Sequence, residues 1–109
     1  MSALTTNTQS NAQGIVNIAN GNVVTDAAAA SAITFTLGFA PRIVRIHNMT
    51  DRISDEWFEG MASASALHTI ATGVRTLELV NGVAVSGNTF TLTAVTMLAS
   101  KAFSWEALG

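Results

Sequence analysis

Apolar and polar side chains alternate along five short stretches of this chain. The apolar positions of these stretches are Ile33, Phe35 and Leu37, then Val44 and Ile46, then Leu77 and Leu79, then Phe90 and Leu92, and finally Phe103 and Trp105. Alternation with a period of two is the pattern of β-strands that bury one face. We therefore expect the apolar residues of the first four stretches, together with Phe103, to form the core.

Glycine and asparagine mark the chain reversals between these strands. Asn81-Gly82 is a strong signal for a two-residue hairpin, because a type I′ turn needs positive φ at both positions. This turn predicts that residues 74–80 pair with residues 83–87. The single proline, Pro41, is expected at the first position of a strand, where a missing N–H is tolerated. Further reversals are predicted at Ala19–Asn22, Asn48–Asp51 and Gly87-Asn88.

Two segments do not follow the alternating pattern. Asp26 suits the cap of a helical turn over residues 27–32, but six residues are too few for a helix without tertiary support. Residues 60–72 combine near-helical spacing of apolar residues with many serines and threonines, and we interpret them as irregular. The strands, roughly seven or eight at spacings near ten residues, predict an all-β domain over residues 15–109, a β-sandwich or jelly-roll-like fold.

Residues 1–14, MSALTTNTQSNAQG, precede this domain and show neither charge nor periodicity. Leu4 is their only large apolar side chain after Met1, so the segment alone cannot bury enough apolar area to offset its ordering entropy. We interpret residues 1–14 as an extended N-terminal arm that contacts another subunit or a larger assembly.

The composition is unusual in its shortage of charge. Charged residues make up 11% of the 109 residues, against roughly 25% in ordinary domains, while the hydrophobic fraction is 49%. A surface of hydroxyls, amides and methyls does little to repel neighbours. It suits either a protein that is covered in its working state or a monomer with a threonine-rich β surface. The net charge of −2 offers no cationic footprint for nucleic acid.

The chain contains no cysteine, which excludes disulfides and cysteine chemistry. It opens with no signal peptide and holds no uncharged apolar stretch of about 18 residues. We therefore expect a soluble protein without membrane partners that is synthesised in a cytoplasm.

Four of the seven acidic residues lie within nine positions that also hold Trp57 and Phe58. In an extended strand Asp55 and Glu59 point to the same side as Trp57, and Glu56 points to the other side. A glycosidase needs two carboxylates that face each other across a sugar ring, usually from different strands. We interpret the stretch 53–61 as a strand in which Trp57 or Phe58 anchors the packing, with its acids facing solvent or a neighbouring subunit.

The other chemically capable side chains form no recognisable site. Residues 51–56 lack the alternating oxygen ligands and the glycine of a calcium loop. His47 and His68 are not at metal-ligand spacing, and Ser63 and Ser65 lie in no nucleophile elbow. We therefore predict that the protein is not an enzyme and has no catalytic, cofactor-binding or metal-binding residues. Charge compensation of the acids is expected from Arg42, Arg45 and Arg52.

Several strand-and-turn motifs follow one another in a characteristic order. They are Gly38-Phe39-Ala40-Pro41-Arg42-Ile43-Val44, Asn48-Met49-Thr50-Asp51-Arg52, Glu56-Trp57-Phe58-Glu59-Gly60-Met61, Gly73-Val74-Arg75-Thr76-Leu77 and Phe103-Ser104-Trp105-Glu106-Ala107. This order, over residues 38–61, 73–87 and 103–109, resembles small virion structural proteins of tailed bacteriophages that decorate or cement the capsid.

The resemblance implies a β-sandwich on the capsid surface of the virion, in many copies that lock capsomers together. The implied partners are the major capsid protein and further copies of the chain, with a trimer favoured. The family has no catalytic residues or cofactors to carry over. Two alternatives remain open: another virion component such as a tail, neck or fibre-base protein, and a sugar-binding module or small enzyme.

Overall fold

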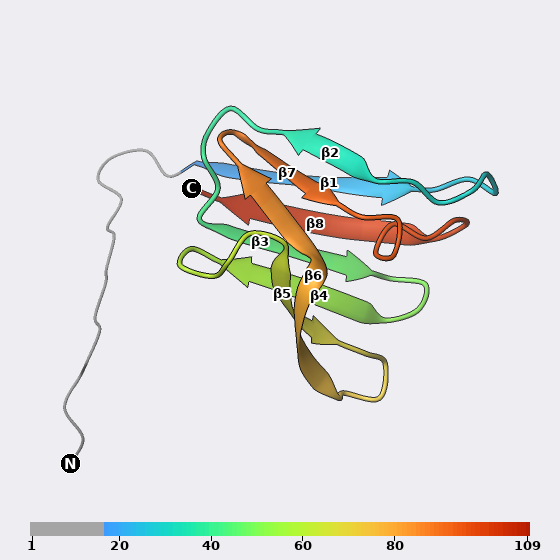
Figure 1. Cartoon of the computed structure of the whole chain (residues 1–109). Helices are drawn as coiled ribbons and strands as arrows, with labels where there is room; N and C mark the ends of the chain where they lie inside the picture. The colour runs from blue at the N-terminus through green and yellow to red at the C-terminus, as the bar shows by residue number, and fades with distance from the viewer. Residues whose placement is uncertain (1–16) are drawn as a thin grey trace, which may run out of the picture.

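Eight β-strands make up the regular structure of residues 17–109, the part of the chain that the computed structural model describes (Figure 1). They are β1 (Ile18–Val24), β2 (Ile33–Thr36), β3 (Ile43–Asn48), β4 (Ile53–Phe58), β5 (Ser65–Thr69), β6 (Arg75–Ser86), β7 (Thr89–Leu92) and β8 (Ala102–Leu108). None of the described residues belongs to a helix that could span a membrane. The predicted arm, residues 1–14, lies outside the described residues.

All eight strands form one antiparallel sheet in the order β1-β8-β3-β4-β5-β6-β7-β2. The sheet curls, so that β2 at one edge comes close to β8 near the other edge: the rings of Phe35 and Trp105 lie 5.3 Å apart (Figure 1). The predicted all-β class is confirmed. The finer prediction of a sandwich or jelly roll is not confirmed, because the strands form one continuous sheet.

The inner face of the curled sheet holds the core. Phe90 is completely buried there, stacked on Phe35 at 4.7 Å and edge-on to Trp105 at 5.4 Å between ring centroids. Two predicted core residues, Ile33 and Phe35, are only partly buried and pack against this core. The predicted core residues that are confirmed as buried are Leu37, Val44, Ile46, Phe90, Leu92 and Phe103.

The prediction that Leu77 and Leu79 lie in the core is wrong. Their relative exposures are 61% and 65%. The first half of β6, Arg75–Glu78, pairs only with β5, because β7 joins β6 only from Val83 onward. The β5–β6 hairpin therefore extends beyond the body of the sheet, and the alternating pattern of β6 meets no second layer that would cover it (Figure 1).

The predicted turn at Asn81-Gly82 is also wrong, because both residues lie within β6. The register with β5 jumps from Ala66–Glu78 to Ser65–Val83, so residues 79–82 form a bulge in β6. Glycine is needed at position 82 for close approach: an added Cβ would lie 2.6 Å from the Ala66 backbone nitrogen. Instead the strands reverse at Gly87-Asn88, as predicted there, where Gly87 has a φ of 57°.

Two further predictions about the regular elements are wrong. Ala19–Asn22 is part of β1 and makes no turn; Gly21 gives room to the Trp105 indole, whose Nε1 an added Cβ would meet at 2.8 Å. Residues 60–72 are not irregular throughout, because they contain β5. Serine and threonine suit a strand that pairs on both sides as well as they suit a loop.

Three predictions about short segments remain: the turn after Asn48, the helical turn after Asp26 and the position of Pro41. Asn48 begins the polar turn between β3 and β4, where its Oδ1 accepts the backbone N–H groups of Thr50 and Asp51, each at 3.0 Å. Asp26 starts no helix: its Oδ1 accepts only the Ala28 N–H at 3.0 Å, and the segment after it has no regular structure. Pro41 lies two residues before β3, which begins at Ile43, so it is not the first residue of the strand as predicted.

Candidate functional site

Asp55 is buried and not exposed, which corrects the prediction that the acids of 53–61 all face solvent or a partner. It lies on β4 opposite His68 of β5, and its Oδ1 is 2.7 Å from His68 Nδ1. Only 4% of Asp55 is exposed. Burial raises the pKa of the Asp55 carboxyl above its ordinary value of 3.8, while the hydrogen bond to His68 opposes that shift.

The other acids of the cluster pair with basic residues of the same chain. Arg45 on β3 contacts Glu56 at 3.2 Å and Glu106 of β8 at 3.0 Å, which places these groups on the outer face of the sheet. Both partners raise the pKa of Arg45, with the Glu106 hydrogen bond the larger cause. Arg42 lies 3.9 Å from Glu59. Charge compensation by Arg42 and Arg45 is thus confirmed.

Trp57 anchors the packing of β4, as predicted. It belongs to the core with 7% exposure, and its indole N–H donates to the Ala62 carbonyl at 3.2 Å. Phe58 faces the opposite side, where the Arg45 guanidinium lies 5.8 Å from its ring centroid. A sugar ring has no access to the buried face of Trp57, so a sugar-binding site built on this tryptophan has no support.

The two histidines and the two serines considered from the sequence do not form a common site. His47 is exposed on β3, whereas His68 is bound to Asp55. The Ser65 hydroxyl donates to the Ala62 carbonyl at 2.6 Å, and the Ser63 hydroxyl donates to the Val85 carbonyl at 3.4 Å. Within residues 17–109 no three histidine or carboxylate side chains gather closely enough to hold a metal ion.

Asp55 and His68 line a pocket on the inner face, called here the Asp55 pocket, with a volume of about 110 Å³. Its apolar walls are Ile46, Ile53, Val95, Leu98 and Phe103. Its polar lining is Asn48, Asp55, His68, Glu78, Asn81 and Thr96. Glu78 directly precedes the β6 bulge and Asn81 lies within it, and Glu78 Oε1 accepts the backbone N–H groups of Val80 and Asn81 at 3.3 and 2.8 Å. These backbone hydrogen bonds lower the pKa of Glu78.

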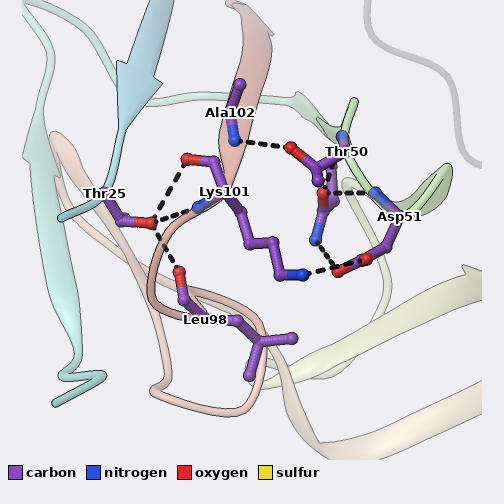
Figure 2. A network of polar contacts seen from close by, with 7 residues as sticks. Thr25, Thr50, Asp51, Leu98, Lys101 and Ala102 are labelled. Carbon is purple, nitrogen blue, oxygen red and sulfur yellow. Dashed lines mark hydrogen bonds and ion pairs between the residues drawn. The ribbon is translucent and has the colours of Figure 1, made fainter. Parts of the chain in front are cut away.

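A network of polar contacts holds the loop that carries Leu98 against the turn between β3 and β4 (Figure 2). The Thr25 hydroxyl donates to the Leu98 carbonyl at 2.6 Å and accepts the Lys101 N–H at 2.9 Å. Lys101 Nζ lies 3.1 Å from Asp51, and the Thr50 hydroxyl accepts a backbone N–H at the start of β8 at 3.0 Å. This wall of the Asp55 pocket is therefore fixed by the fold.

A second candidate surface lies on the extending β5–β6 hairpin. Five large apolar residues with substantial exposure lie within eleven positions of this hairpin and its bulge: Ile70, Val74, Leu77, Leu79 and Val80. We call them the hairpin patch. Arg75 at the start of β6 and Glu78 are the only charged residues between Ile70 and Gly82. Exposed apolar side chains at this density make the hairpin a candidate interaction surface.

Comparison with protein-family models, with curated proteins and with solved structures finds no match to this chain.

Sequence reasoning missed the pocket because it treated 53–61 and 60–72 separately. Asp55 shares a strand face with Trp57, and this parity already pointed to burial once Trp57 was given a core role. The pairing with His68 was hidden because 60–72 was interpreted as irregular, and no sequence signal placed Glu78 beside them. That placement depends on the bulge in β6.

Proposed function

We propose that the protein is a capsid decoration (cement) protein of a tailed bacteriophage, which binds the outer shell in many copies and stabilises it. In this proposal its partners are the major capsid protein and further copies of the chain, as a homo-oligomer for which a trimer is favoured. Its role is structural and not enzymatic, and its place is the capsid surface of the virion. The motifs of residues 38–61, 73–87 and 103–109 are the basis for naming this family.

The observation that carries the proposal is the hairpin patch. A chain with 11% charged residues leaves Leu77 and Leu79 more than half exposed on a hairpin that extends beyond the core. Burying such a pair yields about 1.5–3 kcal/mol per side chain, which makes contact with another protein favourable. The same low charge means that little electrostatic repulsion opposes close packing of copies.

The edges of the sheet give independent support for a role in assembly. The edge strands β1 and β2 carry no charged residue and no proline, which are two of the devices that proteins use to block edge-to-edge pairing. Exposed backbone groups along these edges suit contacts between neighbouring copies. A monomer that works alone would gain nothing from such unprotected edges.

The chemistry of the acidic cluster favours this class over an enzyme or a sugar-binding module. Glu56 and Glu59 contact arginines of their own chain, and Trp57 is buried in the core. Asp55 faces a pocket on the inner face, away from Glu56 on the outer face, so the two carboxylates do not face each other across a substrate.

The direct test combines a mass measurement with a binding assay. Light scattering coupled to size-exclusion chromatography should give a multiple of 11.3 kDa, with three as the expected multiple. The protein, added to undecorated heads of the phage that encodes it, should sediment with the heads and saturate at a fixed ratio to the capsid protein. It should also raise the temperature at which the heads rupture. Binding to purified tails but not heads would replace the proposal by a tail role, and binding to neither would overturn it.

A further inference from the structure

The Asp55 pocket combines apolar walls with a polar end. Its volume of about 110 Å³ is somewhat below the roughly 150 Å³ of an engineered apolar cavity that holds benzene. The pocket is thus large enough for a group the size of a side chain, and too small for a drug-sized ligand. The fixed wall at Leu98 means that the space exists before any ligand arrives.

Both carboxylates of the pocket keep an acceptor oxygen that makes no hydrogen bond to the described residues. Asp55 uses Oδ1 for His68, and Glu78 uses Oε1 for the N–H groups of Val80 and Asn81 at 3.3 and 2.8 Å. His68 Nδ1 faces Asp55, and its second ring nitrogen, Nε2, makes no hydrogen bond to the described residues. The polar end of the pocket is therefore rich in acceptors.

Basic side chains that could neutralise these acceptors are engaged elsewhere. Lys101 contacts Asp51 at 3.1 Å, and Arg45 lies on the outer face with Glu56. Neither lines the pocket, and His68 is the one basic residue that does. An anionic ligand would meet two carboxylates, and a neutral apolar ligand would strip water from them without supplying hydrogen bonds.

A ligand that matches this lining carries N–H donors and a positive charge at the end of a short alkyl chain. We propose that the Asp55 pocket binds a primary alkylammonium group, with the charge at Asp55 and Glu78 and the methylene groups against the apolar walls. The side chain of a lysine has this chemistry. Resting on the proposed function, we infer that a lysine of the capsid protein fills the pocket in the assembled particle, because the one lysine of this chain, Lys101, is already paired with Asp51.

The pocket is tested first on the isolated full-length protein at constant pH and ionic strength. n-Butylammonium, Nα-acetyl-lysine methylamide, 1-pentanol and valerate are titrated while the amide signals of β4, β5 and β6 are followed by NMR. We expect the two amines to shift signals around Asp55 saturably and to bind at least tenfold more tightly than the alcohol and the acid. Equal binding of amine and alcohol would overturn the role of the carboxylates.

Variants locate the binding site. Asp55→Asn and Glu78→Gln should each weaken n-butylammonium binding at least fivefold, and Glu78→Gln keeps an oxygen for the backbone N–H groups of the bulge. Glu56→Gln removes a carboxylate on the outer face and should bind like the wild type. If Asp55→Asn does not fold, Glu78→Gln alone decides. Unchanged binding by folded Glu78→Gln, or equal losses in Glu56→Gln, would contradict the proposal.

The two amines separate the sources of the ligand. Binding of Nα-acetyl-lysine methylamide supports a protein side chain, whereas binding of n-butylammonium alone would overturn the side-chain assignment in favour of a free amine. Head-binding assays keep the two proposals distinct. If the protein binds amines but not heads, the ligand proposed for the pocket stands and the decoration role is overturned. If it binds heads but not amines, the decoration role stands and the ligand proposed for the pocket is overturned.

Discussion

The aromatic core and the β5–β6 hairpin are built from the same alternating sequence pattern, yet the apolar residues of the core are buried and those of the hairpin are exposed. Phe90 and Leu92 alternate with threonine on β7 and are completely buried, because β2 pairs beside β7 and the curled sheet brings Trp105 of β8 against Phe90. Leu77 and Leu79 alternate with Thr76 and Glu78 on β6 and remain exposed. An alternating strand thus tells which face is apolar, but the topology decides whether anything covers that face.

The comparison also separates stability from function. Residues of the core hold the sheet in its curled form, whereas the residues of the hairpin patch lie outside the core and leave much of their apolar surface exposed. Apolar residues kept exposed on an extending hairpin are costly for solubility, so their presence favours a covered surface in the working state. The following predictions test this division.

The largest expected effect is the loss of the central aromatic ring. Phe90→Ala should lower the free energy of unfolding by about 3–5 kcal/mol, because it leaves a cavity between Phe35 and Trp105. Leu77→Ala should change it by less than about 0.5 kcal/mol. Urea titrations monitored by tryptophan fluorescence measure both. Similar losses in the two variants would mean that the hairpin patch is part of the core.

A smaller loss is expected where β6 bends against β5. Gly82→Ala places a methyl group against the backbone of Ser65 and Ala66 and should cost about 1–3 kcal/mol as an overpacked site. Gly38→Ala is the matched control, since an added Cβ there meets nothing within 4 Å. Thermal melts of both variants suffice. A Gly82→Ala protein as stable as the wild type would contradict the close approach of the β6 bulge to the backbone of β5.

The core and hairpin meet at Asp55, where we expect a pH effect. Burial raises the pKa of Asp55 from 3.8, so the folded state favours the protonated acid. Its contribution to stability is complete below 3.8 and is lost as the pH rises through the raised pKa. Asp55→Asn mimics the neutral acid and should gain melting temperature relative to the wild type as the pH increases.

The measurement is a set of melting curves between about pH 3 and pH 7, with Glu56→Gln to correct for the general loss of one carboxylate. A difference between Asp55→Asn and wild type that stays constant over this range would show that ionisation of Asp55 does not oppose folding.

The smallest effect concerns the wall of the pocket. Thr25→Val removes the hydroxyl that links Leu98 and Lys101 and should cost about 1 kcal/mol, because the site is partly exposed to water. Thr34→Val on β2 is the control: its hydroxyl bonds only to Thr91 on the exposed side of the sheet. Equal melting temperatures for wild type and Thr25→Val would mean that the network does not fix this wall.

The turns that the sequence predicted best are those set by contacts between residues close together along the chain. The turn after Asn48 follows from local hydrogen bonds to its side chain, and the Gly87-Asn88 turn follows from positive φ at Gly87. The prediction of a turn at Asn81-Gly82 was wrong because the glycine there allows the backbone of β6 to approach β5 closely, which is a contact that the local sequence does not reveal. The position of β8 between β1 and β3 also depends on pairing with residues distant along the chain, and no pattern within β8 predicts it.

The candidate sites also differ in whether neighbouring strands or distant parts of the chain form them. Salt bridges of Arg42 and Arg45 were predictable because acids and arginines alternate on adjacent strands. The Asp55 pocket needs residues from β3 through β6 and the loop before β8, which only the completed sheet brings together.

The central claim is that the hairpin patch is the surface by which the protein attaches to its partner. The most direct measurement is head occupancy of the Leu77→Ser/Leu79→Ser variant against wild type, by co-sedimentation over a range of protein concentrations. Met49→Ser is the control, because Met49 is 62% exposed in the turn between β3 and β4, outside the hairpin patch and the edge strands. We predict at least tenfold weaker binding for the double variant, with an unchanged melting temperature and wild-type binding by Met49→Ser. Full occupancy by the double variant at wild-type concentrations would contradict the claim.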